Sequence, residues 1–458
     1  MEKFNITEIE IPNYDTSGSF VVILAIFWGI VLARLATQLL NMRVKPNLCY
    51  LVEFTLIVLP TVLFVTIASD YSGHFVALMS LLAFWFIQKT RSLQRAKERS
   101  VFILGHRPQY LTVMRSMIQL ITSVCILAVD FKCFYRPYSK SEFFGAQLMD
   151  TGIGLFVASM AFVSRRPKTK AELQREVFGD ALPLICYCSI RTLIVIVLKY
   201  HLAEREYGRH LNAFFILGFT KLFGSLCGYQ LNSDAQLLPM GVTLLFAHQC
   251  ALLYGISDYV QTDKKPPLTL FQLNRQGPLS VPGFVALYLI TIHVSKWWRL
   301  KPFLNYEEMV LKLRKAYRLS LLGWSLTFIC SHTIGICRVT CNLGYVCWMF
   351  AIYMSMFTLC LFVFEFVINT VYPVKKIEKE TLKETTVCCT WDKEIVYTYT
   401  ICESVNQHGL MFFLLANAWT GLANLYLNLS LVSTPNSVAI LVLYMFLNTF
   451  VVHRKYCQ

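Results

Sequence analysis

Long apolar runs dominate this chain and determine the class of fold that it can adopt. Residues 20–41 contain one charged side chain, Arg34, and residues 50–69 contain only Glu53. An α-helix of about 20 apolar residues is long enough to cross the hydrocarbon core of a bilayer. Only 15% of the residues are charged, against about 25% in a typical soluble protein. The sequence therefore predicts an all-α fold, a polytopic transmembrane helical bundle.

Thirteen segments have the length and composition of membrane spans. They lie near residues 20–41, 50–69, 72–88, 114–131, 147–164, 182–199, 211–229, 238–259, 281–298, 317–336, 343–369, 408–430 and 437–452. The sequence contains no internal repeat and no linker rich in Gly, Ser or Pro. We therefore expect a single membrane domain over residues 1–458, with an N-terminal segment at 1–19 and a cytosolic loop at 370–407.

Lys and Arg are distributed unequally between the two sides of the predicted spans. The connections and tail on the side opposite the N-terminus contain 25 of these residues, and the connections on the N-terminal side contain 10. The positive-inside rule then places the N-terminus in the lumen and the C-terminus in the cytosol. The sequon Asn5-Ile6-Thr7 faces a compartment where glycosylation occurs, so Asn5 is a predicted glycosylation site. The net charge of +15 could suggest that the protein binds nucleic acid, but this distribution argues against it. It indicates instead that the basic residues lie beside the headgroups of the lipid bilayer.

Two aspartates lie at the edges of predicted spans. Asp130 ends the apolar stretch ILAVD, and Asp150 begins the next apolar run. A carboxylate at such a boundary is costly unless it is paired or hydrated. One interpretation of Asp130 is a structural salt bridge to a cation of the following loop, namely Lys132, Arg136 or Lys140. The other is a general base tuned by partial burial and a nearby cation. For Asp150, close to a helix N-terminus, a capping role is favoured.

Other polar residues lie inside or beside the spans without forming a recognisable site. His210, His248 and His332 are too scattered for a metal site, and no pair of CxxC motifs is present, so no bound metal is expected. Arg191 and Lys199 lie roughly 80° apart on one helix. They would either hold an anionic headgroup inside the bundle or balance buried acids.

The region 122–154 contains a pattern that resembles a known family. It reads T-x-x-x-ILAVDF-x-x-F and then K-x-E-x-x-G-x-x-LMD-x-G-x-G, which is similar to the GPI inositol acyltransferase family of the endoplasmic reticulum. Further matches follow in the family's order: Arg191 with Lys199 and Tyr200, EYG-x-H-x-N-x-FF at 206–215, His248-Gln249, NRQG at 274–277, Arg338 with Asn342, Tyr345 and Trp348, and FLLANAWTGLANL at 413–425. One departure is Phe134-Tyr135-Arg136-Pro137, where the family usually has F-P-R-R, and it bears on the geometry of this loop.

The resemblance implies an acyltransferase of GPI-anchor biosynthesis. Such an enzyme transfers a fatty acyl chain, usually palmitoyl, from acyl-CoA to the inositol of glucosaminyl-phosphatidylinositol. Asp130 and Lys140 are then the implied catalytic pair, with Asp130 as general base and Lys140 assisting. Because a thioester is already activated, direct transfer is preferred over a covalent acyl-enzyme. Acyl-CoA is a co-substrate, and neither a resident cofactor nor an obligate protein partner is expected.

Polar residues on the predicted lumenal side, together with matched family positions, form the expected substrate site. The predicted substrate-binding residues are Lys132, Arg136, Glu142, Asp150, Arg191, Lys199, Glu206, His210, Asn212, Arg338, Asn417 and Asn424. The predicted acyl-pocket residues are Phe131, Gly152, Gly154, Phe214 and Phe215, the glycines because a missing side chain permits close approach. The alternative function is an ion-coupled transporter that uses Asp130, Asp150 and Glu206 as a proton relay.

Overall fold

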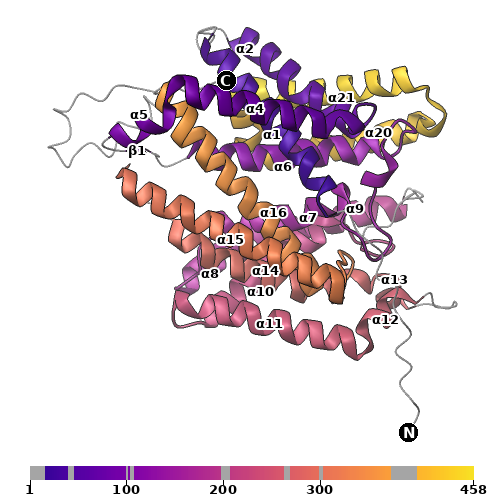
Figure 1. Ribbon diagram of the computed structural model, residues 1–458. Coiled ribbons are helices and arrows are strands. Elements are labelled where there is room, and N and C mark those ends of the chain that lie inside the picture. The colour runs from indigo at the N-terminus through magenta and orange to yellow at the C-terminus, as the bar shows by residue number, and fades with distance from the viewer. Residues whose placement is uncertain are drawn as a thin grey trace. The chain divides into compact units, whose positions relative to one another are not determined.

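A computed structural model describes most of the chain, and helices make up nearly all of the part that it describes (Figure 1). The described residues are 16–39, 46–99, 102–103, 108–197, 207–262, 269–298, 303–372 and 400–457. The expectation of an all-α polytopic bundle is confirmed. Within the described residues, β structure is confined to an antiparallel pair, β1 (Phe102–Ile103) with β2 (Phe303–Leu304), and to a single bridge between Phe144 and Cys337.

The helices follow the predicted spans closely. Their bounds are α1 (Gly18–Leu39), α2 (Pro46–Glu53), α3 (Leu59–Val65), α4 (Ser72–Thr90), α5 (Ser92–Glu98), α6 (Gln109–Ala128), α7 (Leu148–Val163), α8 (Lys170–Glu176), α9 (Leu182–Val197), α10 (Ala213–Gln230) and α11 (Leu237–Ala251). They continue with α12 (Ser257–Gln261), α13 (Leu270–Leu273), α14 (Gln276–Trp298), α15 (Tyr306–Thr333), α16 (Leu343–Leu361), α17 (Asn369–Val371), α19 (Ile401–Gln407), α20 (Gly409–Tyr426) and α21 (Thr434–Cys457). Each of the thirteen predicted spans contains a helix.

Length and hydropathy identify the helices that could cross a membrane. Among the described residues, 9 helical segments are long and apolar enough, and α7 is a shorter apolar helix. Some of these segments continue through wider turns: Phe54–Val58 joins α2 to α3, and Phe362–Ile368 continues α16. The number of crossings and the lumenal position of the N-terminus stay predictions.

The described chain forms two compact units, which we consider separately. The first unit comprises residues 1–16, 140–300 and 317–355. In it α14 packs against α7, α10 and α11. The close packing of α10 against α14 depends on Gly224 of α10. A Cβ at this position would clash with the ring of Tyr288 of α14, which is fully buried. The core of this unit is therefore built around α14.

The second unit comprises residues 17–139, 301–316 and 356–458. Here α6 packs against α19, α20 and α21, and α1 packs against α4. Gly29 of α1 allows close approach of the neighbouring segment, since a Cβ would lie 2.7 Å from the carbonyl oxygen of Leu56. The packing of α20 against α6 matters for the site, because it brings residues near 420 to the end of the ILAVD helix.

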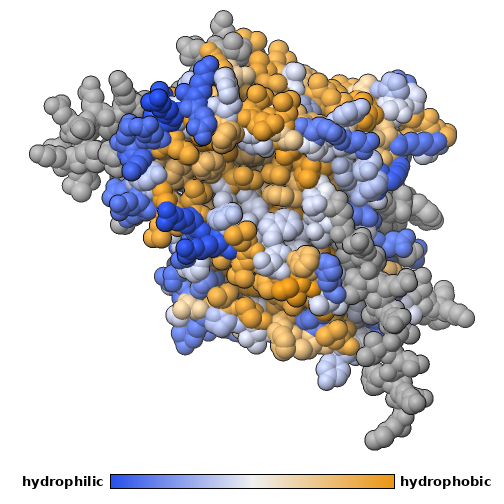
Figure 2. Space-filling model, viewed as in Figure 1, coloured by the Kyte–Doolittle hydropathy of each residue, from blue (hydrophilic) through white to orange (hydrophobic). Residues whose placement is uncertain are grey.

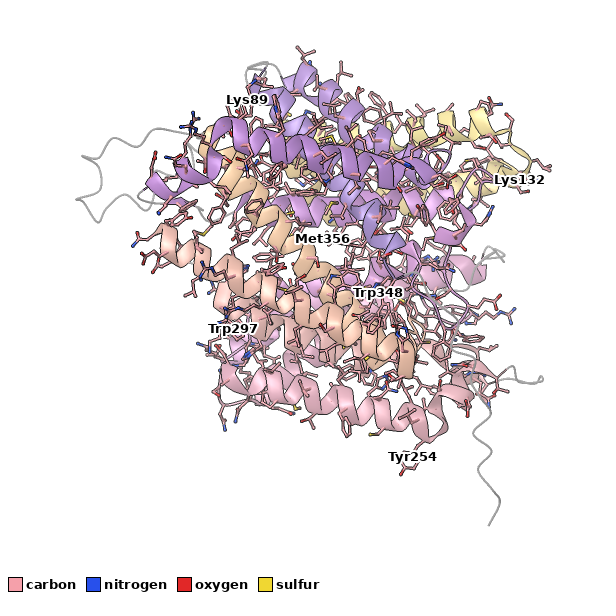
Figure 3. The ribbon with its side chains drawn as sticks, in the orientation of Figure 1. Lys89, Lys132, Tyr254, Trp297, Trp348 and Met356 are labelled. Atoms are coloured by element: carbon pink, nitrogen blue, oxygen red, sulfur yellow. The ribbon has the colours of Figure 1, made fainter. Side chains whose placement is uncertain are left out.

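Exposed apolar side chains cover the outer faces of several helices. Figure 2 shows hydrophobic side chains over much of the visible surface, and Tyr254, which is 93% exposed, projects away from the molecule in Figure 3. Phe246 and Leu253 are exposed as well. Because water would penalise so much exposed apolar surface, these faces indicate contact with lipid.

Candidate functional site

Asp130 lies in the turn that directly follows α6. The helix ends at Ala128, and the turn is closed by hydrogen bonds from the Asp130 N–H to the Leu127 carbonyl, 3.3 Å, and from the Phe131 N–H to the Ala128 carbonyl, 3.0 Å. The Asp130 side chain is half-buried. Asn424 of α20 donates an Nδ2–H to its Oδ2 at 2.8 Å. The ILAVD motif therefore presents a fixed carboxylate at the end of an apolar helix.

The turn around Asp130 is braced by Arg136. Its Nη1 donates to the Val129 carbonyl at 3.1 Å, and its Nη2 donates to the Phe131 carbonyl at 2.9 Å. The last carbonyls of an α-helix have no partners within the helix. A cationic fork close to the C-terminus of α6 satisfies carbonyls there and is favoured by the helix dipole.

Lys140 and Asp130 belong to different units. Lys140 is half-buried and is the first residue of its segment in the first unit, whereas Asp130 belongs to the second unit. The next residue, Ser141, donates its backbone N–H to both carboxylate oxygens of Asp150, each at 3.3 Å. The backbone beside Lys140 is thus anchored to Asp150.

Asp150 is fully buried at the start of α7. Its Oδ2 accepts the Gln147 backbone N–H at 3.2 Å, as part of a capping box. Its Oδ1 forms an ion pair with Nε of Arg338 at 2.8 Å, and the two side chains are 0% and 5% exposed. The capping role that the sequence favours for Asp150 is therefore present, together with an ion pair to a residue far along the chain.

Arg338 lies in the connection between α15 and α16. Its guanidinium carbon is 5.2 Å from the ring centroid of Tyr207. Burial by itself lowers the pKa of the Arg338 guanidinium. The electrostatic interactions with Tyr207 and Asp150 have the larger combined effect and raise this pKa above its usual range. Asn342 shapes this connection: its Oδ1 accepts the N–H groups of Cys337 and Tyr345, both at 3.0 Å. Arg338 is consequently a permanent cation inside this unit.

Tyr345 connects α16 to α7. Its hydroxyl donates to the Asp150 carbonyl at 2.7 Å and accepts the Gly154 N–H at 3.2 Å. A Cβ on Gly154 would lie 2.8 Å from the Tyr345 hydroxyl oxygen and even closer to Met349. The space that Gly154 leaves is thus filled by protein side chains. Gly152 is half-buried, and its place in an acyl pocket stays a prediction.

Two matched stretches, 207–212 and 274–277, meet in the first unit. The His210 N–H donates to Oδ1 of Asn274 at 2.8 Å, and the Asn274 amide contacts His210 Nδ1 at 3.1 Å. Gly208 has φ +113°, and a Cβ there would lie 2.6 Å from the Asn274 Cα, so only glycine fits. Asn212 caps α10 by accepting the N–H groups of Phe214 and Phe215 at 3.0 and 3.3 Å. Hydrogen bonds within the first unit thus engage the His210 N–H, the Asn274 amide and Oδ1 of Asn212.

The remaining predicted site residues come from several elements of both units. Lys132 and Glu142 are exposed, and Figure 3 marks Lys132 on the connection after α6. Arg191 is half-buried on α9. Asn417 donates to the Phe413 carbonyl of its own helix at 2.7 Å. The buried rings among the predicted acyl-pocket residues are Phe131 and Phe214. Asn5, Lys199 and Glu206 lie outside the described residues, and no group of three His, Cys, Asp or Glu residues within the described ranges could hold a metal.

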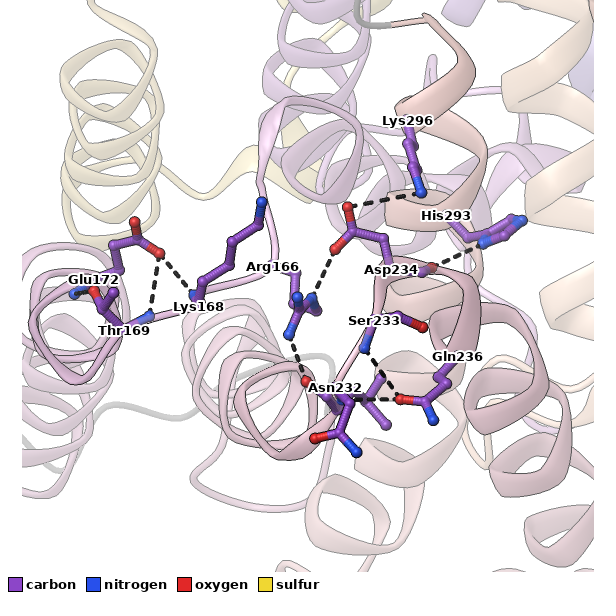
Figure 4. Close-up of polar contacts among 11 residues, drawn as sticks. Arg166, Lys168, Thr169, Glu172, Asn232, Ser233, Asp234, Gln236, His293 and Lys296 are labelled. Atoms are coloured by element: carbon purple, nitrogen blue, oxygen red, sulfur yellow. Dashed lines mark hydrogen bonds and ion pairs between the residues drawn. The ribbon is translucent and has the colours of Figure 1, made fainter.

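Sequence reasoning assigned no chemistry to the connection 165–176, but the structure places a charged cluster there (Figure 4). Nε of Arg166 contacts Oδ1 of Asp234 at 2.7 Å, and Lys296 lies 3.8 Å from the same carboxylate. Nearby, the buried Lys221 contacts Glu176 at 3.2 Å and Asp180 at 3.4 Å. A lysine within an otherwise apolar run was the available signal for this cluster. Its arrangement ties the α7–α8 and α10–α11 connections to α14.

Comparison with known proteins gives a consistent result over nearly the whole chain. A family model described as GWT1 matches residues 13–454. An uncharacterized protein of Arabidopsis thaliana is 29% identical over 402 residues, covering 86% of this chain and 84% of that protein. The GPI-anchored wall transfer protein 1 of Aspergillus oryzae is 30% identical over 364 residues, covering 73% and 69%. Its namesake in Schizosaccharomyces pombe is 24% identical over 467 residues, covering 96% and 94%.

Proposed function

The chain belongs to the GWT1 family of GPI inositol acyltransferases, and from this premise we propose that it acylates the inositol of glucosaminyl-phosphatidylinositol. The acyl donor in this proposal is palmitoyl-CoA. Relatives named GPI-anchored wall transfer protein 1 support a role in GPI-anchor biosynthesis. The many apolar helices and this role support residence in the endoplasmic reticulum membrane. The proposed orientation, with the N-terminus lumenal and the C-terminus cytosolic, is supported by the unequal distribution of Lys and Arg.

One observation carries the chemical part of the proposal, namely the held carboxylate of Asp130. It lies at the end of an apolar helix, half-buried, with Asn424 fixing one of its oxygens at 2.8 Å. A general base needs a fixed position and access to the proton that it removes. Asp150 has its oxygens occupied by Ser141, Gln147 and Arg338 and is 0% exposed. Of the two aspartates in the motif region, Asp130 is therefore the one suited to act on a substrate.

The proposed reaction is a direct acyl transfer. Asp130 accepts the proton of an inositol hydroxyl as that oxygen attacks the thioester carbonyl carbon. A new C–O bond forms, and the carbonyl oxygen becomes an oxyanion, which the ammonium of Lys140 stabilises. The C–S bond then breaks, and CoA leaves as a thiolate. The thiolate takes up the proton that Asp130 removed from the inositol hydroxyl, so Asp130 returns to its ionised form. The products are the inositol ester and free CoA, and no covalent enzyme intermediate is required.

Cations outside the catalytic pair are available for the phosphates of the two substrates. Lys132 is exposed in the loop that follows Asp130, and Arg191 is half-buried on α9. Both suit phosphate recognition by charge. The guanidinium of Arg338 forms an ion pair with Asp150. We therefore propose that Lys132 and Arg191 bind the substrate phosphates.

The test is CoA release by the purified protein. Wild-type protein in detergent or nanodiscs should release CoA from palmitoyl-CoA, measured with a thiol reagent, only when glucosaminyl-phosphatidylinositol is added. Mass spectrometry should find the acyl chain on the inositol ring. Release of CoA without the lipid acceptor, or acylation of another group, would overturn the proposal.

Two substitutions test the roles of the pair. Asp130→Asn keeps the shape but cannot accept a proton, and a general base is worth about 100- to 10,000-fold in rate. Lys140→Ala should be similarly damaging, and Lys140→Arg should rescue only in part, because a guanidinium is longer and planar. A charge-swapped Asp130→Lys, Lys140→Asp enzyme that works would show that the pair is structural.

A further inference from the structure

Arg136 holds the two carbonyls that flank Asp130 in the chain. Nη1 bonds to Val129 and Nη2 bonds to Phe131. The two nitrogens belong to one rigid, planar group, so the separation and direction of the two carbonyls are fixed together. The peptide units on both sides of the Asp130 Cα are consequently fixed, and with them the direction in which its side chain leaves the backbone.

The segment that carries Arg136 is itself well anchored. Arg136–Tyr138 forms a 3₁₀ turn, and Pro137 has a restricted φ. The Arg136 carbonyl accepts both the N–H of Ser139 at 2.9 Å and its hydroxyl at 2.7 Å. The N–H of Tyr135 donates to the Val65 carbonyl at the end of α3, 3.3 Å away. The backbone that carries the Arg136 side chain is therefore held in place, and this is needed for the guanidinium to fix the position of another residue.

Asn424 acts on the other end of the same residue. It lies on α20, which packs against α6, and donates to Oδ2 of Asp130 at 2.8 Å. A hydrogen bond from a neutral amide fixes the rotation of the carboxylate, because an amide donor has a definite direction. Main chain and side chain of Asp130 are thus held by different residues from different segments.

We propose that Arg136 and Asn424 are the positioning residues of Asp130: Arg136 sets its backbone and Asn424 sets its carboxylate. The inference rests on the proposed function, in which Asp130 removes the proton of the acceptor hydroxyl. It assigns Arg136 a task different from phosphate binding. Neither residue touches the reacting atoms; both act through Asp130.

The kinetic constants kcat and KM distinguish positioning of Asp130 from binding of a substrate phosphate. A displacement of a catalytic group by about 1 Å costs on the order of 100-fold in rate. Arg136→Ala should therefore lower kcat by roughly that factor and leave KM for palmitoyl-CoA and for the lipid acceptor within about 2-fold. Lys132→Ala, in the same loop, should show the opposite pattern, a raised KM with kcat retained. Arg95→Ala, an exposed arginine on α5, is the matched control and should behave as wild type.

Conservative variants test the geometry of the brace. Arg136→Lys keeps the charge but has a single ammonium in place of a planar fork, so it should restore only part of kcat. Asn424→Leu has a similar size and lacks the donor, and it should lower kcat by roughly 10-fold, the weight of a hydrogen bond to a charged group. Arg136→Lys with full wild-type kcat would show that only the positive charge matters and would overturn the inference.

A positioning role of Arg136 predicts kinetics that differ from those of a substrate-binding or a purely structural role. A raised KM with normal kcat in Arg136→Ala would make Arg136 a substrate cation and overturn its positioning role. A lowered Tm with normal kcat per folded molecule would make it purely structural, with the same consequence. If Arg136→Ala does not fold, Arg136→Lys and Asn424→Leu still decide the question. Wild-type protein that transfers no acyl chain to the lipid acceptor would refute the proposed function, and an active Asp130→Asn enzyme would refute the general-base role on which the positioning depends. An inactive Asp130→Asn with a normal kcat in Arg136→Ala and Asn424→Leu would refute only the positioning.

Discussion

The buried ion pair between Asp150 and Arg338 gives the most direct test of how the first unit is held together. The two side chains are 0% and 5% exposed and 2.8 Å apart. Asp150→Asn retains the shape and an oxygen acceptor for Ser141 but removes the carboxylate charge that faces the buried guanidinium. Removing one partner of a buried pair costs about 3–5 kcal/mol. At about 2 °C for each kcal/mol in a chain of this size, Tm should fall by roughly 6–10 °C.

The measurement is thermal unfolding of the purified protein in detergent, followed by size-exclusion chromatography at one heating rate. The matched control is Asp234→Asn, because the Arg166–Asp234 pair has a similar separation, 2.7 Å, with the Asp234 side chain 27% exposed. A partly exposed pair contributes about 1 kcal/mol or less, so Tm of this variant should fall by at most about 2 °C. Asp150→Asn combined with Arg338→Met should recover much of the loss, since this pair of changes removes both charges and keeps an oxygen acceptor for the Ser141 and Gln147 N–H groups. Equal losses in Asp150→Asn and Asp234→Asn would refute the reasoning.

The other predictions concern packing, backbone and topology. Gly154→Leu should destabilise the protein by more than the usual overpacking cost of about 1–3 kcal/mol, because Tyr345 and Met349 occupy that space; an unchanged Tm would contradict the packing. Gly208→Ala should cost about 1 kcal/mol or more from its positive φ alone, read out in the same thermal assay, and a neutral effect would mean that the turn adopts another conformation. Cysteines introduced into the 132–146 loop should resist labelling from the cytosolic side of sealed microsomes, and their labelling there would reverse the predicted topology.

Much of the fold was predictable, because an apolar run long enough to span a membrane can adopt few backbone conformations. In lipid every N–H and C=O must be satisfied within the segment, so such a run forms a helix. The ends of helices were also readable, as with Asp150 in the first turn of α7. The widened turns, such as Phe54–Val58 and Phe362–Ile368, were not predictable, because no residue type or spacing marks them.

Partners across the chain could not be predicted from local patterns. The cations within ten residues of Asp130 can be named from the sequence as candidate partners, but its hydrogen bond to Asn424 spans 294 positions, and no local pattern predicts it. The ion pair of Asp150 with Arg338 spans 188 positions. Such contacts depend on which helices pack together, and one apolar helix face resembles another in composition. The motif residues could therefore be named from the sequence, but the bonds between them required the fold.

Asp130 and Asp150 show how the same residue type at the same kind of boundary takes different roles. Asp150 is enclosed, and its oxygens accept from Ser141, Gln147 and Arg338. Its charge is used to fix the start of α7 and the backbone beside Lys140, and no substrate reaches it while that network is intact. Asp130 is half-buried, and its held oxygen accepts from the neutral amide of Asn424. A carboxylate that is held but still accessible can remove a proton. The enclosed aspartate therefore has a structural role in its own unit, and the accessible aspartate is the one to which the proposed reaction gives the proton.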